Sequence, residues 1–423
     1  MNSSPPKRTA KHLLASDLRG IAQLGSQATA GIARIVEGVH QSIWDRLGVP
    51  GGHAPGQTRG ITGLAYRSVH GVNRLVGDGL QALLKRLEPL LAADAQTQQA
   101  SPQRAALLAA LNGVMGDHLL ASNNPLAIPM SMRWQDHTLD WQDLPPDFAP
   151  SGKVLLLIHG LCMNDLQWQA SHKGQPVDHG QSLAAALGYC PIYLRYNSGL
   201  HTSQNGRELA AQLELLVRHW PVPVEEISIV AHSMGGLLTR SACHFATEQT
   251  SHWLPLLKNI VFLGTPHHGA PLERAGNWID VLLGSTPYTA PLAKLGQLRS
   301  AGITDLRHGH VRDEDWMGDN RFHRLPDQRL ITPLPAGVNC FAVAATMAAK
   351  RGALANRLIG DGLVPLHSAL GEHSDPRRDL GFAKSEQLIC YRMNHMELLS
   401  SPMLTQQMQD WLKPAKPSKA VKS

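Results

Sequence analysis

A serine between small residues stands at the most chemically suggestive place in this sequence. Ser233 lies in Ala231-His-Ser-Met-Gly-Gly236, directly after the apolar run Ile227–Ala231. A serine at a sharp strand-to-helix turn presents its hydroxyl at the end of the strand, if the residues two before and two after it are small. In this pattern the residue two before the serine is usually glycine, and here it is Ala231. The alternative interpretation is an ordinary strand-turn-helix in which the serine has no chemical role. We predict that Ser233 is a nucleophile.

A serine hydroxyl needs a base to take its proton and a carboxylate to orient that base. Asp361 stands between glycines in Gly360-Asp-Gly-Leu-Val-Pro365, after the apolar run Val338–Ala345. A plain turn would also explain an aspartate between glycines, but its place after the serine and before the last apolar run favours the acid. His395 follows that last run and is predicted to be the base.

The chain has 22 histidines, so the other candidates for the base must be excluded before His395 is chosen. His367 is only six residues from Asp361, too close to bridge acid and serine. His267 and His268 precede Asp361 and break the order serine, acid, histidine. His232, beside the nucleophile, is expected to point away from the site.

The oxyanion that forms during acyl transfer needs hydrogen-bond donors. The segment His159-Gly160-Leu161 immediately follows the apolar run Val154–Ile158, where such a donor is expected. We predict that the backbone N–H groups of Leu161 and Met234 form the oxyanion hole. Gly160 lets the loop turn inward, and His159 supports it through hydrogen bonds.

The elements that must hold these residues alternate between apolar runs and helix-length segments. Continuous apolar runs are typical of parallel strands buried on both faces. They occur at 154–158, 191–196, 227–231, 260–263, 338–345 and 388–391, with a weaker alternating segment at 130–141. Helices are predicted at His179–Leu187 and at Asn205–His219, where Asn205 and Glu208 have capping-box spacing. The predicted fold class is α/β, with a mostly parallel, doubly wound sheet.

The first hundred residues contain an ungapped repeat with a period of 40, in which Arg19-Gly-Ile21 matches Arg59-Gly-Ile61. Apolar residues recur at helical spacing in each copy, and a Gly/Pro-rich stretch separates the copies. We predict a helical region at 1–102 made of two amphipathic repeats. Either it packs on the rest of the protein, or it binds a lipid or granule surface.

The catalytic domain is predicted at 103–412, beginning with a helix near Arg104–Leu120. A long interruption at about 270–335 is interpreted as a lid-type insertion that lines the substrate site. It contains the acidic cluster Asp313-Glu-Asp315, whose spacing does not suggest a metal. Residues 413–423 form a basic tail.

Composition is ordinary for a globular protein, with 43% hydrophobic and 17% charged residues. Residues 1–100 carry eleven Lys or Arg against six Asp or Glu, which favours contact with an anionic membrane or lipid surface; basic ends that only keep the protein in solution are the alternative. No nucleic-acid motif is present, so no nucleic-acid partner is expected. Five scattered cysteines indicate buried free thiols and a cytoplasmic protein, with membrane association through the basic helices as a further option. No cofactor or metal is predicted.

Five motifs in this order resemble the lipase and esterase branch of the α/β-hydrolases, over about residues 150–412. They are His159-Gly160, Ala231–Gly236, Gly264-Thr-Pro-His-His-Gly269, Gly360–Pro365 and His395. The chain is most similar to bacterial lipase-like and GPI-inositol-deacylase-like proteins. The resemblance implies an α/β-hydrolase fold and a Ser233–His395–Asp361 triad.

The predicted activity is hydrolysis of carboxylic esters, through an acyl-enzyme, with a hydrophobic or lipid-like acyl substrate. An acyltransferase or thioesterase would use the same triad. A lipid- or granule-surface binding protein, in which the hydrolase domain is secondary, is the alternative from another class.

Overall fold

The computed structural model describes residues 102–135, 137–270, 300–317, 327, 329–349 and 360–414. The predicted helical repeats at 1–102 therefore lie almost wholly outside the described residues. So do most of the predicted lid insertion at 270–335 and all but the first two residues of the basic tail.

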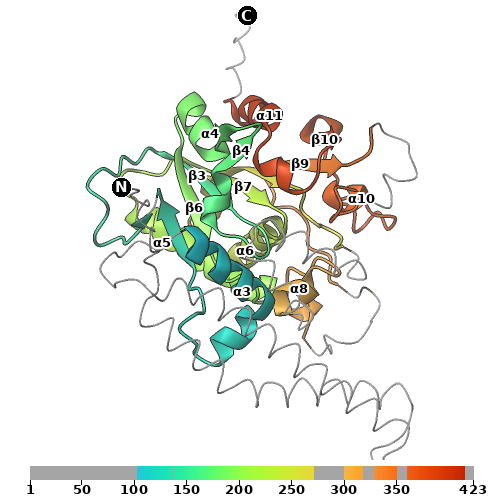
Figure 1. Cartoon of the computed structure of the whole chain (residues 1–423), viewed down its shortest axis with the longest axis horizontal. Coiled ribbons are helices and arrows are strands. Elements are labelled where there is room, and N and C mark those ends of the chain that lie inside the picture. The colour runs from blue at the N-terminus through green and yellow to red at the C-terminus, as the bar shows by residue number, and fades with distance from the viewer. Residues whose placement is uncertain are drawn as a thin grey trace, which may run out of the picture.

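The elements alternate along the chain much as the apolar runs predict (Figure 1). The helices are α3 Pro102–Ala121, α4 His179–Leu187, α5 Thr202–His219, α6 Met234–Gln249, α8 Ala301–Asp305, α10 Leu366–Ala369 and α11 Pro402–Leu412. The strands are β1 Ser131–Trp134, β2 His137–Thr138, β3 Lys153–Ile158, β4 Ala170–His172, β5 Gln175–Val177, β6 Cys190–Arg195, β7 Glu226–His232, β8 Leu257–Leu263, β9 Asn339–Thr346 and β10 Gln387–Tyr391. Short 3₁₀ turns are η1 Asp165–Trp168, η2 Leu254–Leu256, η5 Asp313–Asp315, η6 Lys384–Glu386 and η7 Met396–Leu399.

One eight-stranded sheet forms the centre of the molecule, in the order β10-β9-β8-β7-β3-β6-β1-β2. Strands β3 and β6 to β10 pair in parallel, whereas β1 pairs antiparallel with β6 and with β2. The parallel strands all end at the same edge, so the loops that follow them meet there. The segment predicted at 130–141 is thus an antiparallel edge of the sheet.

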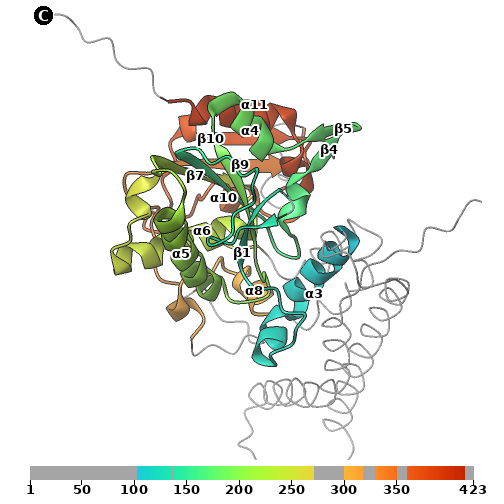
Figure 2. The same ribbon diagram turned by 90° about the vertical axis from the view of Figure 1, so that its left-hand side faces the viewer.

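The sheet is covered by helices on both faces, as Figures 1 and 2 show. Along β3, Val154, Leu156 and Ile158 belong to one apolar core with α3, α5 and α6. Leu155 and Leu157 belong to the other core, with α4 and α11. Because successive strand residues point to opposite faces, an uninterrupted apolar run fills both cores. The predicted α/β, doubly wound fold is confirmed.

Helix α3 lies against the loops that follow β3 and β6. A side chain at Gly113 would come within 2.8 Å of the Cα of Cys162, so the helix backbone contacts that loop directly. Asn197 donates from Nδ2 to the carbonyl of Gly116 at 3.0 Å. The predicted helix near Arg104–Leu120 is therefore present, and it backs the edge where the parallel strands end.

The predicted start of α5 is wrong. The helix begins at Thr202, and its first turn is closed by Gln204, whose side chain accepts from the His201 N–H. Asn205 instead donates from Nδ2 to the carbonyl of Asn197, at 2.9 Å. The capping-box spacing of Asn205 and Glu208 is coincidental because both residues lie inside the helix.

All five cysteines are free and buried, as their apolar surroundings predict. Burial raises the pKa of the Cys162 thiol to about 12, so this thiol is protonated at neutral pH. No described helix is both long and apolar enough to cross a bilayer.

Candidate active site

Ser233 occupies a strained turn between β7 and α6. Its backbone has φ 56° and ψ −124°, a combination that residues other than glycine rarely adopt. The Ser233 N–H donates to the carbonyl of Leu263 at 2.8 Å, which ties the turn to the neighbouring strand β8. Such strain persists only where the surrounding structure enforces it, and it is concentrated at functional sites.

The residues at positions 235 and 231, two on either side of Ser233, are small for different steric reasons. A Cβ atom at Gly235 would lie 2.7 Å from the carbonyl oxygens of both Ile158 and His159, so no side chain fits there. Ala231, in contrast, is fully buried and its methyl group belongs to the apolar core. The departure from the usual glycine at this position is therefore accommodated.

The loop after β3 touches the serine and is held by His159. A Cβ atom at Gly160 would lie 3.0 Å from the Cβ of Ser233. The His159 ring stacks on Tyr196 with centroids 4.3 Å apart, and its Nδ1 lies 2.8 Å from the Gly160 carbonyl oxygen. Burial lowers the pKa of His159 to about 4, so the ring is neutral and donates from Nδ1 to that carbonyl. These contacts are those expected of a residue that supports the loop.

The two predicted oxyanion donors belong to segments next to Ser233: Met234 follows it in the chain, and Leu161 follows Gly160, whose backbone approaches the Ser233 Cβ. Met234 is the first residue of α6, and the first N–H groups of a helix have no partner within it. Leu161 follows Gly160, and the next amide, that of Cys162, donates to the Ser198 Oγ at 3.0 Å. The amides of Met234 and Leu161 thus belong to two segments that meet at the serine.

Asp361 and His395 form a buried pair. The His395 Nδ1 lies 2.6 Å from the Asp361 Oδ2, and the two side chains are 1% and 0% exposed. A carboxylate only accepts, so the His395 Nδ1–H is the donor and Nε2 is left as the basic nitrogen. The other carboxylate oxygen accepts from the amides of Leu363 at 2.9 Å and Val364 at 2.7 Å. Asp361 therefore performs the turn chemistry and also orients the imidazole.

Backbone pairing brings Asp361 to this edge although it is 15 residues beyond the end of β9. The Met347 N–H donates to the carbonyl of Gly360 at 3.0 Å, which returns the chain to the end of that strand. The His395 N–H then donates to the Asp361 carbonyl at 3.2 Å. The acid and the histidine are thus joined through both backbone and side chain.

The His395 ring lies in the immediate surroundings of the serine turn. Its centroid is 4.6 Å from that of His232, the residue before Ser233. A Cβ atom at Gly264 would lie 3.0 Å from the His395 Cε1, and Gly264 follows the residue that accepts the Ser233 N–H. Asp361 and His395 are thus bonded to each other and lie beside the Ser233 turn, at the carboxyl edge of one sheet, whereas the Ser233 Oγ has no hydrogen-bond partner among the described residues.

Gly264 is a site residue whose role spacing alone did not reveal. It has φ +60° and makes room for the His395 ring. The available signal was a glycine directly after the apolar run 260–263, where a backbone close to another group is expected.

The other histidines lie as follows. His232 is buried, and its Nε2 is 3.2 Å from the His395 carbonyl oxygen, so it packs beneath the catalytic candidate. Burial first, and then the charge of His395, hold the pKa of His232 well below its ordinary value. His367 is exposed in α10. His268 has its Nε2 3.0 Å from the Gly371 carbonyl oxygen.

The acidic cluster at 313–315 consists of structural carboxylates. Asp313 pairs with Arg207. Asp315 is buried and accepts from the amides of Val311, Arg312 and Leu330. Within the described ranges, no three His, Cys, Asp or Glu side chains are grouped to hold a metal ion.

Comparisons with known proteins give a family model and several distant structures. A family model described as a domain of unknown function (DUF7379) matches residues 121–305. A search of curated proteins finds no match.

Three similar structures represent the matches. Mature lipase BlEst2 of Bacillus licheniformis is 18% identical, with 64% of this chain and 94% of that chain covered and a TM-score of 0.38. A thermostable esterase from Pseudomonas putida is 14% identical, with 78% and 94% covered and a TM-score of 0.38. Phospholipase PlaB of Legionella pneumophila is 14% identical, with 51% and 44% covered and a TM-score of 0.31. The α/β-hydrolase fold of this chain is itself evident in its parallel sheet, its two helical layers and its strand–serine–helix turn.

Proposed function

We propose that this protein is a serine hydrolase that cleaves carboxylic esters. The observation that carries the proposal is the buried 2.6 Å hydrogen bond between His395 and Asp361, beside the strained turn of Ser233. Recognition of a triad depends on geometry and roles, since the same constellation occurs on unrelated folds. The three residues also follow the chain order serine, acid, histidine of α/β-hydrolases.

The first half of the reaction forms an acyl-enzyme. The Ser233 Oγ attacks the ester carbonyl carbon while His395 Nε2 takes the hydroxyl proton. The negative charge passes to the carbonyl oxygen, which accepts from the amides of Leu161 and Met234. When this intermediate collapses, the bond to the alcohol oxygen breaks and His395 returns the proton to that oxygen.

The second half releases the acid. Water loses a proton to His395 Nε2 and attacks the acyl carbon, and the same two amides accept the charge. The bond to Ser233 Oγ then breaks, and the serine recovers its proton from His395. Asp361 holds the imidazole in the required tautomer in both halves and accepts from Nδ1 throughout.

The surroundings of the serine favour an apolar acyl group. The donor segments contribute the buried side chains of Leu161, Met163 and Met234, and Leu398 lies beside the His395 ring at Gly264. Together with the motifs shared with lipase-like and GPI-inositol-deacylase-like proteins, this supports a hydrophobic ester as substrate.

Covalent labelling by a fluorophosphonate probe tests the nucleophile directly. The full chain should be labelled once and should hydrolyse p-nitrophenyl esters, whereas Ser233→Ala should lose labelling and at least about 10⁴-fold in kcat. Ser241→Ala is the matched control, because Ser241 is another buried serine of α6, two turns further along. Labelling retained in Ser233→Ala, or lost in Ser241→Ala, would contradict the proposal.

The acyl preference is measured with a series of p-nitrophenyl esters from acetate to laurate. An apolar site predicts that kcat/KM rises with chain length before it levels off, by about threefold or more per methylene at first. A steady decline from acetate onward would remove the hydrophobic-substrate part of the proposal and leave the serine hydrolase.

A further inference from the structure

A polar pocket lies two turns along α6 from Ser233, roughly 10 Å away along the helix axis. It is a cavity of about 90 Å³, bordered by α6, by the loop after β8 and by the segments 329–334 and 377–380. That volume is far above the roughly 15 Å³ that one water molecule needs, so a small polyatomic ion fits. Arginine is the most frequent residue in its lining.

Three of the four arginines have carboxylate partners. Arg329 donates from Nε and Nη2 to the two carboxylate oxygens of Asp327, at 2.9 Å each. Arg378 lies 3.7 Å from the same carboxylate, and Arg377 pairs with Asp375 at 2.8 Å. The positive charge of these side chains is therefore largely compensated.

Arg240 is the exception. Its side chain is buried, and its Nη2 donates to the carbonyl of Thr332 at 2.5 Å. Its Nε and Nη1 find no hydrogen-bond partner among the described residues. Burial, with a contribution from Arg329, lowers the pKa of Arg240 to about 10, so the group is still charged at pH 7. No ion pair of Arg240 is found within the described part of the chain; Asp315 acts on it only through its nearby charge, and Asp379 is the carboxylate in the pocket lining. A buried guanidinium without a directly bonded carboxylate is unfavourable, since buried charges are normally paired.

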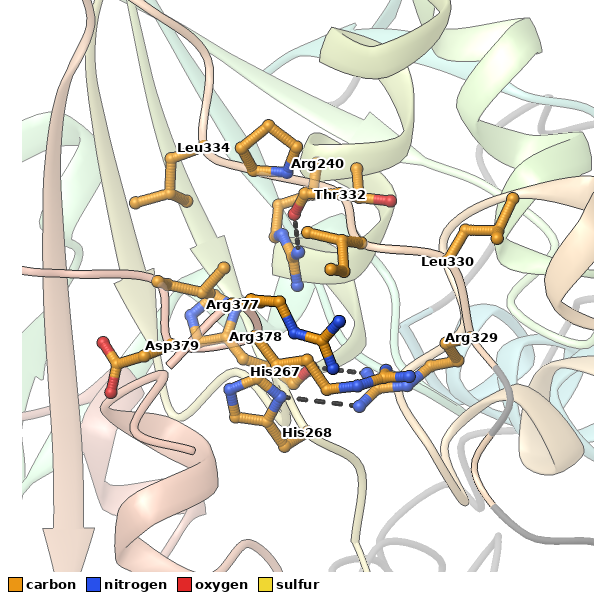
Figure 3. Close-up of a pocket in the computed structure, with 13 residues that line it drawn as sticks. Arg240, His267, His268, Arg329, Leu330, Thr332, Leu334, Arg377, Arg378 and Asp379 are labelled. Carbon is orange, nitrogen blue, oxygen red and sulfur yellow. Dashed lines mark hydrogen bonds between the residues drawn. The ribbon is translucent and has the colours of Figure 1, made fainter. Parts of the chain in front are cut away.

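Two further buried donors border the same space without partners. The Thr332 Oγ1 and both ring nitrogens of His267 make no hydrogen bond within the described part of the chain. The His267 ring is wedged between Phe262 and Phe382, with centroids 4.8 and 5.6 Å away, so it cannot turn toward solvent without disturbing the core. Figure 3 shows Arg240 reaching in from α6 and Arg329 approaching from the other side, with His267 and His268 beneath them.

We propose that this pocket binds a phosphate-type oxyanion, either inorganic phosphate or the phosphate group of a small ester. Water would supply hydrogen bonds to Arg240, Thr332 and His267 but would leave the charge of Arg240 uncompensated. An oxyanion supplies both, since a guanidinium and a phosphate form two parallel charge-assisted hydrogen bonds. The exposed side chains of Leu330 and Ile331 at the same border leave room for an apolar group attached to the phosphate.

The first experiment compares thermal unfolding of the full chain in phosphate and in chloride at matched ionic strength and pH. Binding predicts that the midpoint rises with phosphate concentration, as mass action requires, and does not rise with chloride. Arg240→Met should weaken the phosphate response at least tenfold. The same variant should keep or raise the midpoint in chloride, because it replaces an unpaired buried charge by an apolar chain of similar length.

Two other variants make this result specific. Arg218→Met, at an exposed position in the last turn of α5, should keep the full phosphate response. Thr332→Val leaves Arg240 in place and should weaken the stabilisation by phosphate severalfold. This variant can test the proposal even if Arg240→Met fails to fold. An equal shift in phosphate and chloride, or an unchanged phosphate response in both pocket variants, would overturn the proposal.

Further titrations separate the sources of the phosphate group. Inorganic phosphate, glycerol 3-phosphate, and phosphatidylcholine vesicles with or without phosphatidate are each tested against the full chain and Arg240→Met. A response to the first two alone indicates a soluble anion, and vesicle binding that needs both phosphatidate and Arg240 indicates a lipid phosphate. If no response in any titration depends on Arg240, the pocket is not an oxyanion site.

Discussion

Two regions border the first half of α6, one at Ser233 and one at Arg240, and they differ in how their charges are balanced. At Ser233, the carboxylate of Asp361 is saturated by two backbone amides and by His395. At Arg240, a buried cation borders unpartnered polar atoms of Thr332 and His267 and forms no ion pair among the described residues. The first region has all the groups that its proposed chemistry requires. In the second region no anion pairs with Arg240, and this difference is the reason why we propose a binding site there.

The largest expected effect tests how far the first region depends on the charge of Asp361. Asp361→Asn keeps the shape and the turn but offers an amide in place of a pure acceptor, which favours the wrong histidine tautomer. We expect a loss of about 10⁴-fold in kcat for p-nitrophenyl esters. Asp147→Asn, at an exposed position before β3, is the control and should retain full activity. A loss of less than tenfold in Asp361→Asn would mean that this carboxylate does not orient the base.

Acid is expected to lower the free energy of unfolding through histidines of both regions, whereas phosphate is expected to act through the Arg240 pocket alone. Burial lowers the pKa of both His159, beside the serine, and His268, beside the arginine pocket, to about 4. The unfolded chain takes up a proton on each near pH 6.5 and the folded chain does not, so stability is lost as pH falls from about 6.5 toward 4. A fully buried histidine such as His159 contributes at most about 1.4 kcal/mol per pH unit.

Urea unfolding at pH 7.5, 6 and 5 measures this loss. Phosphate should restore part of the unfolding free energy at each pH in the natural chain, and Arg240→Met should need at least about tenfold more phosphate for the same gain. A free energy of unfolding that stays flat or rises toward pH 5 would mean that the buried histidines are already protonated in the fold.

The smallest effect is expected at the border of the second region. Arg377 is 78% exposed and already paired with Asp375, so its charge is screened by water and by its partner. Arg377→Met should change phosphate affinity by less than about threefold, measured by the same thermal titration. A loss as large as that in Arg240→Met would show that the anion binds at the surface and that the buried arginine is not its main ligand.

The residues proposed for the first region could be named from the sequence, whereas those of the second could not, for a physical reason. The predicted site residues other than His395 directly follow a strand or lie in a short glycine-containing segment, and His395 stands four residues after the end of β10. The ends of parallel strands meet by geometry, which brings these segments together. The apolar runs located β3, β6, β7, β9 and β10 to within two residues at each end, because strands buried on both faces are mostly apolar.

The local sequence pattern did not reveal the features that depend on contacts between distant segments. Arg240, His267 and Thr332 come from three separate segments, and no spacing rule joins them. The hairpin of β4 and β5 was missed because its strands have three residues each, although Lys173-Gly174 between them, both with positive φ, is a typical hairpin turn. The cap of α5 was misplaced because histidine is not among the residues favoured at helix starts.

Helix α3 has a practical consequence for any attempt to isolate the catalytic unit. The motifs all lie between residues 159 and 395, and the matching family model begins at residue 121, where α3 ends. A fragment cut at that boundary would retain Ser233, Asp361 and His395. It would also uncover the back of the Leu161–Cys162 loop, against which the backbone of Gly113 is packed. Expression of a minimal fragment with this fold should therefore start upstream of Pro102.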